Sequence, residues 1–77
     1  MSVVRGTKIT GEPLYVPAHR VIAVEPTPED WHEIHDGSIL VLDTLNSKGE
    51  HTTMFMREPA PIVAAALAEA LNGMHRN

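Results

Sequence analysis

The sequence predicts a small α+β domain, in which a mainly antiparallel, strongly bent sheet of four to five strands is followed by one C-terminal helix. Two observations lead to this class. Short apolar runs separated by turn residues fill most of the chain, whereas its last part holds one long run with helical spacing. At 77 residues, the chain is predicted to form a single domain over 1–77.

The helix is predicted at about 59–73. Pro59 and Pro61 suit a first helical turn, and Asn72 and Gly73 form a typical stop signal. Seven apolar residues at helical spacing are expected to form one stripe: Ile62, Val63, Ala66, Leu67, Ala70, Leu71 and Met74. As the longest helical pattern in the chain, this segment is expected to lie across the sheet.

The first part of the chain is predicted to hold three strands. The first covers 3–9 and ends at the turn 10–13. The second covers 14–16, and Pro17, which lacks a backbone donor, places it at an edge or a break. The third, at 20–25, is rich in β-branched residues and is the strongest of the three.

The segment that follows these strands is predicted as a short helix at about 28–35 or as a plain loop. Thr27 could cap such a helix, with Pro28 at its first position. Asp36 and Gly37 would end it.

The remaining strands, 38–45 and 51–57, are predicted to form a hairpin around the polar loop 46–50. Ile39 and Val41 point to one face of this sheet and Leu40 to the other, so both faces are apolar. The third strand shows the same pattern, with Val21 and Ala23 opposed to Ile22 and Val24.

One helix can cover only one face of such a sheet. The other face is therefore expected to curl into a small barrel, or to be covered by a second copy or by a partner. Because two-fold assemblies are the commonest oligomers, a symmetric homodimer is predicted.

The composition limits the classes of function. A formal charge of −4 argues against a phosphate-backbone binder, and the absence of cysteine excludes disulfides and thiolate zinc sites. No apolar run is long enough to cross a membrane and no signal-peptide region is recognisable, so a soluble, cytoplasmic protein without membrane contact is expected. Nucleic-acid binding stays as an alternative, in which Tyr15 or Phe55 stacks a base on the sheet surface.

Residues 31–36 form the only cluster of ligand-type side chains. In a helix, His32 and His35 would be neighbours that could share a metal with Asp36 or another His, but solvated loop histidines explain the pattern better and no metal is predicted. Trp31 either folds back on the sheet together with Ile34 or contributes to a contact surface. Five residues are predicted as interaction residues: Trp31, His32, His35, Tyr15 and Arg20.

Catalysis has little support in the sequence. The serines lie at the terminus or in turns without a nucleophile elbow, and the glycines form no phosphate-binding loop. No enzyme activity and no cofactor are therefore predicted.

The order of these segments resembles that of the short FlbD-type flagellar proteins and their relatives. The matching residues are Gly11, the LYV motif at 14–16 and the stretch RVIAVEPTPE at 20–29, followed by an apolar strand, a turn, another strand, a Glu and a helix. This chain differs by the inserted DWHEIHDGS at 30–38 and by its many histidines. The resemblance implies a small, non-enzymatic accessory domain.

The sequence thus predicts a non-catalytic regulatory or accessory protein of a bacterium or phage that acts through protein–protein interaction. A nucleic-acid-binding regulator is the first alternative. A metal-binding module that uses His32 and His35 is the second.

Overall fold

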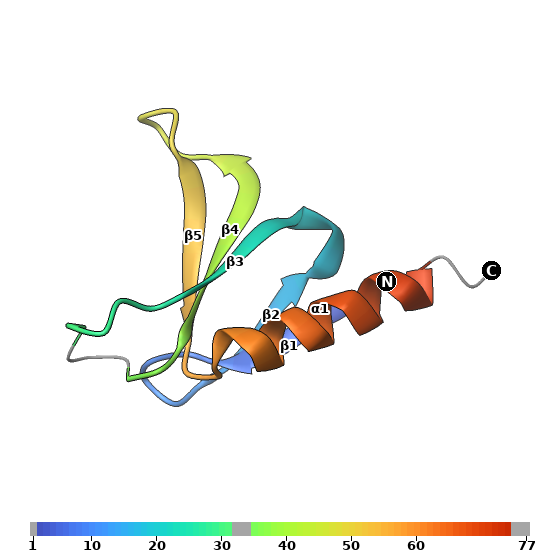
Figure 1. The fold of residues 1–77 in the computed structure, drawn as a ribbon. Helices are drawn as coiled ribbons and strands as arrows, with labels where there is room; N and C mark the ends of the chain where they lie inside the picture. The colour runs from blue at the N-terminus through green and yellow to red at the C-terminus, as the bar shows by residue number, and fades with distance from the viewer. Residues whose placement is uncertain (1, 32–34, 75–77) are drawn as a thin grey trace.

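The computed structural model describes residues 2–31 and 35–74 (Figure 1). Within these ranges it confirms the α+β class, with five antiparallel strands and one C-terminal helix. In chain order the elements are β1 (Val3–Thr7), β2 (Pro13–Pro17), the short 3₁₀ helix η1 (Ala18–Arg20), β3 (Val21–Pro26), β4 (Ser38–Leu45), β5 (His51–Met56) and α1 (Ala60–Met74).

The strands are divided between two sheets instead of forming one bent sheet. β1 and β2 make a two-stranded sheet, and β3, β4 and β5 make a three-stranded sheet with β4 in the middle. The break falls at Pro17, which lacks a backbone N–H, and at η1, which turns the chain between the two sheets. Ala18 in this turn is buried, and its N–H donates to the carbonyl of Ser2 at 3.0 Å, so the corner is tied to the start of the chain.

β3 departs from regular alternation. Its pairing with β4 is irregular between Val21, which lies opposite Leu42, and Ala23, which lies opposite Val41. Because of this bulge, Val21 and Val24 both pack against the core, and Ile22 is exposed. The predicted opposition of Val21 and Ala23 to Ile22 and Val24 is therefore wrong.

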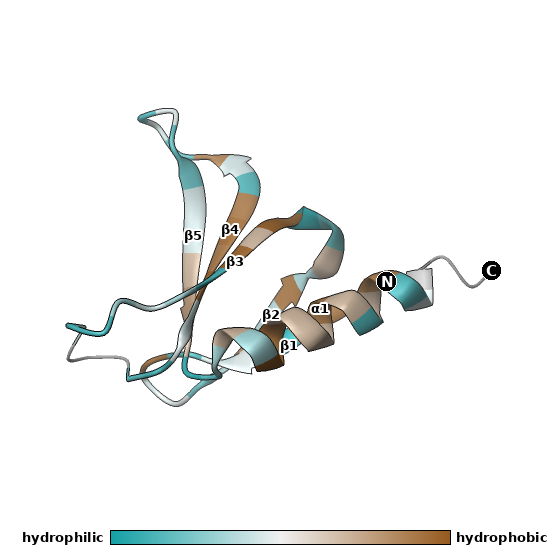
Figure 2. Cartoon of the chain, in the orientation of Figure 1, coloured by the Kyte–Doolittle hydropathy of each residue, from teal (hydrophilic) through white to brown (hydrophobic). Residues whose placement is uncertain are grey.

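The hairpin of β4 and β5 is formed as predicted. The Asn46 side-chain oxygen accepts hydrogen bonds from the N–H groups of Lys48 and Glu50, at 2.9 and 3.1 Å. Gly49 has a φ of 79°, which suits a glycine in a tight turn. Figure 2 shows that this loop is hydrophilic, whereas the strand β4 that leads into it is largely hydrophobic.

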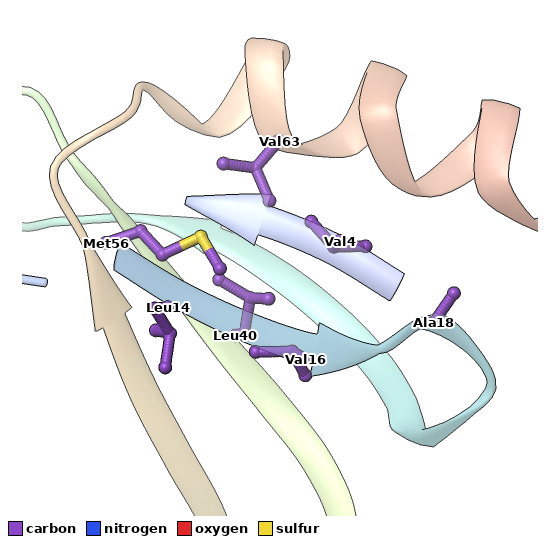
Figure 3. Packing of buried hydrophobic residues seen from close by; sticks show 7 residues of the cluster. All are labelled: Val4, Leu14, Val16, Ala18, Leu40, Met56 and Val63. Carbon is purple, nitrogen blue, oxygen red and sulfur yellow. The ribbon is translucent and has the colours of Figure 1, made fainter. Parts of the chain in front are cut away.

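The core lies where α1 and the two sheets meet (Figure 3). It consists of Val4, Leu14, Val16, Ala18, Leu40, Met56 and Val63. From α1, Val63 is buried and Ala66, Leu67, Ala70 and Leu71 pack around the cluster, as the predicted stripe requires.

The predicted stripe is wrong at one residue, because the side chain of Ile62 does not face the core and the residue is 60% exposed. Val63, the next residue along the helix, occupies the core position, and Ile62 is rotated about 100° away from it. The side chain of Met74 lies outside what the structure describes.

The junction between β5 and α1 is bound to the end of β1. The Glu58 carboxylate accepts hydrogen bonds from both the N–H and the hydroxyl of Thr7, each at 2.8 Å. Arg57 adds two contacts, because its N–H donates to the Thr7 carbonyl and its guanidinium donates to the Ile9 carbonyl. Partial burial would raise the pKa of Glu58, but the Thr7 hydrogen bonds and the charge of Arg57 outweigh it, and the pKa lies below its ordinary value of 4.5.

The lowered pKa predicts that this junction is sensitive to acid. Its contribution to stability is present above pH 4.5 and is lost as the pH falls through the folded-state pKa of Glu58. Glu58→Gln is expected to lower the free energy of unfolding by about 1 kcal/mol at pH 7, and the difference from wild type should shrink at pH 3. Urea denaturation at both pH values measures this. Glu69→Gln, an exposed site on α1, is the control, and an equal Glu58→Gln effect at pH 7 and pH 3 would contradict the prediction.

Ser38 is a polar exception in the core. Its side chain is completely buried beside Met56, and its hydroxyl has no hydrogen-bond partner among the described residues. Ser38→Ala is expected to raise the free energy of unfolding by about 1 kcal/mol, because it removes a buried, unpaired hydroxyl with little change in volume. Thermal denaturation tests this, with Ser47→Ala in the exposed hairpin loop as the control. A loss of stability in Ser38→Ala would indicate that the hydroxyl has a partner.

Candidate functional site

The face of the three-stranded sheet that points away from the core is largely apolar. Leu40 and Met54 lie opposite each other on the core side, so the alternate residues of β4 and β5 lie on the opposite side. The ladder places Ile39 between Glu25 and Phe55, and Val41 between Ala23 and Thr53. We define the outer sheet face as Ala23, Ile39, Val41, Thr53, Phe55 and the adjoining Trp31.

The contacts across this face show why it is continuous. Ile39 and Val41 are two residues apart on the central strand and therefore neighbours on one side of the sheet. The side chains of Ala23, Ile39, Val41 and Phe55 are partly exposed, and α1 packs on the core side of the same sheet. The central strand thus carries the apolar middle of the face, with Glu25 and Thr53 at its edges.

Trp31 extends the face beyond β5. Its ring meets the ring of Phe55 edge to face, with the ring centroids 5.3 Å apart and the planes inclined at 62°. A turn places it there, since the N–H of Trp31 donates to the carbonyl of Pro28 at 3.1 Å. The Trp31 ring thus folds back onto the sheet at Phe55, and because its side chain stays partly exposed it also belongs to the outer sheet face. Ile34 and His32 lie outside the described residues.

The segment between β3 and β4 is closed at its base. Thr27 and Gly37 are bound twice, because the Thr27 N–H donates to the Gly37 carbonyl at 3.2 Å and the Gly37 N–H donates to the Thr27 hydroxyl at 3.0 Å. The described residues 27–31 form a turn and contain no α-helix, so at these positions the loop alternative is correct. Asp36, with a φ of 61°, completes the return to β4.

A hollow of about 350 Å³ lies beside this loop and is lined by Thr27, Pro28, Glu29, His35 and Asp36. Within residues 2–31 and 35–74, no three His, Asp or Glu side chains are grouped closely enough to hold a metal ion. The metal-binding hypothesis depends on His32, which is outside these ranges. Nothing in the described part of the chain adds support to it.

The other predicted interaction residues lie elsewhere. Tyr15, on β2, is 57% exposed, and the Arg5 guanidinium lies over its ring, 5.9 Å from the centroid. Arg20, at the end of η1, forms an exposed ion pair with Asp43 at 3.5 Å. Arg20 ends the element that precedes β3 and Trp31 lies in the segment 27–31 that follows it, at opposite ends of β3 (Figure 1), so Arg20 and Trp31 do not form one site.

Five residues of the outer sheet face were not among the predicted interaction residues: Ala23, Ile39, Val41, Thr53 and Phe55. The signal for them was nevertheless present in the sequence, because both alternating sets of residues in these strands are apolar. What the sequence did not supply was the choice of face, which depends on the side that α1 covers.

Comparisons of the chain with models of protein families, with curated proteins and with solved structures find no match. Within the described residues, no helix has the length and apolar character needed to cross a membrane.

Proposed function

We propose that the chain is a non-catalytic accessory protein that acts by binding another protein through the outer sheet face. The observation that carries this proposal is the continuous apolar surface built on Ile39 and Val41 and extended by the Trp31–Phe55 pair. Surfaces of this composition, with aromatic residues at the contact and polar residues at the margin, are typical of protein interfaces. The sequence resemblance to FlbD-type accessory proteins agrees with this class of function.

Site-specific photo-crosslinking tests the proposal in cells that produce the chain. A photoreactive phenylalanine analogue replaces Thr53, which is exposed at the edge of the outer sheet face. Adducts with protein, whether a second copy or another chain, are expected from this position. Ile62, an exposed apolar residue on α1, is the matched control. Absence of adducts at Thr53, or equal adducts at both positions, would overturn the proposal.

A nucleic-acid-binding regulator is the second candidate, and it is favoured by Arg5 and Tyr15. An exposed ring with a guanidinium beside it is able to stack a base and contact a phosphate, and Lys8 lies in the adjoining loop. On this hypothesis, a single-stranded oligonucleotide is shifted in a gel at low salt, and Tyr15→Ala abolishes the shift. A shift that persists in Tyr15→Ala, or no shift, removes this candidate.

A further inference from the structure

We infer that the partner of the outer sheet face is a second copy of this chain, so that two three-stranded sheets pack face to face around a two-fold axis. This inference rests on the proposed function and names the partner. In such an assembly each copy contributes the same surface, and the residues nearest the axis meet their own counterparts. Ile39 and Val41, on the central strand, are the residues expected there.

The exposed area supports an additional interface. The chain exposes 5415 Å² of surface. A monomeric globular protein of 8.4 kDa exposes about 4600 Å² by the scaling of area with mass. The excess is about 800 Å², which is about the area that one partner buries in a standard interface. An interface of standard size would therefore bring the exposed area of the chain to the value expected for its mass.

The charge distribution of the face favours a copy over a charged partner. The chain carries a formal charge of −4, yet Ala23, Ile39, Val41, Thr53 and Phe55 are all uncharged. Glu25 adjoins them on β3, which is an edge strand, so its carboxylate lies at the margin of the face. Two such faces meet without charge repulsion in the middle. On the β5 side, Lys8 lines a hollow together with Thr53 and Phe55.

The geometry suits a sandwich of two sheets. Two packed sheets lie about 10 Å apart and fill the space between them with the side chains of their inner faces. The branched side chains of Ile39 and Val41 would supply the centre of this layer. Phe55 and Trp31, on the β5 side, would widen it. Burial of these side chains gives the small domain a second apolar layer in addition to its own core.

Molar mass in solution tests the inference. Light scattering behind a sizing column is expected to give about twice the 8.4 kDa of one chain, independent of concentration in the micromolar range. Val41→Glu and Thr53→Arg are each expected to yield monomers, because Val41→Glu places a charge in the middle of the apolar layer and Thr53→Arg places one directly across from Val41. Ile62→Glu, an equivalent change at an exposed site on α1, should remain dimeric. Circular dichroism establishes whether each variant is folded. If Val41→Glu does not fold, Thr53→Arg is the variant that tests the inference.

A disulfide cross-link between two copies tests the position of the two-fold axis. The chain contains no cysteine, so Val41→Cys introduces a single thiol, which is expected to form a disulfide-linked dimer on mild oxidation, whereas Ile62→Cys is not. A wild-type monomer, or a dimer that survives in folded Thr53→Arg, would overturn the inference. If wild type is monomeric but Thr53 still crosslinks to another protein, the proposed function stands and only the choice of partner is wrong.

Discussion

Leu40→Ala is expected to lower the free energy of unfolding by about 2–5 kcal/mol, as large-to-small changes in a closed core do. Leu40 is fully buried on the central strand of the larger sheet, within the cluster that also holds Val4 and Val63. Its truncation would leave a cavity where the two sheets and α1 meet. Urea denaturation at one fixed protein concentration measures the change.

The same strand provides a matched control for this prediction. Leu45, at the other end of β4, is 60% exposed, and Leu45→Ala is expected to change the free energy of unfolding by no more than about 0.5 kcal/mol. A domain of this size has a total stability of only about 4–12 kcal/mol, so Leu40→Ala should come close to unfolding it. Equal effects of the two substitutions would show that Leu40 is not in the core.

Gly6→Ala is expected to cost about 1–3 kcal/mol, although alanine usually stabilises a strand relative to glycine. A Cβ atom at Gly6 would overlap the Met56 sulfur and lie 3.0 Å from Met56 Cγ. Met56 is fully buried, so its side chain cannot swing into solvent and has to repack within the core. Gly6 has no positive φ, and the expected loss is therefore steric rather than a backbone effect.

A double-mutant cycle separates this steric effect from any other. Gly6→Ala should cost much less in a Met56→Ala background, which gives a coupling energy of at least about 1 kcal/mol. Gly73→Ala is the control, because a Cβ there meets no atom within 4 Å and alanine favours the helix. Thermal or urea denaturation of the four proteins gives the result. Additive costs at Gly6 and Met56 would contradict the close contact.

The sequence predicts the elements whose signals are local. Both bounds of β4 were predicted correctly, and α1 was displaced by one residue, because alternation, proline positions and the Asn–Gly stop are readable within a few residues. The bulge at Ile22, the division into two sheets and the rotation of α1 that exposes Ile62 depend on contacts between distant segments. No local pattern contains those contacts.

The same distinction applies to the candidate site. Trp31 stands out in the sequence as the only tryptophan, but its partner Phe55 lies beyond another strand and a loop. Tyr15 and Arg20 were grouped with it by residue type alone, and the fold places them on other elements. A prediction from residue type selects side chains able to bind, whereas the topology decides which of them share a surface.

The bond between Thr7 and Glu58 has a consequence for synthesis of the chain. These residues are 51 positions apart, and Val4 likewise needs Val63 to complete the core. A ribosome releases the N-terminal strands first, when the segment that covers them has not yet been made. The hairpin of β1 and β2 therefore leaves the ribosome with its apolar side uncovered. The domain is expected to fold only after the α1 segment has left the ribosome.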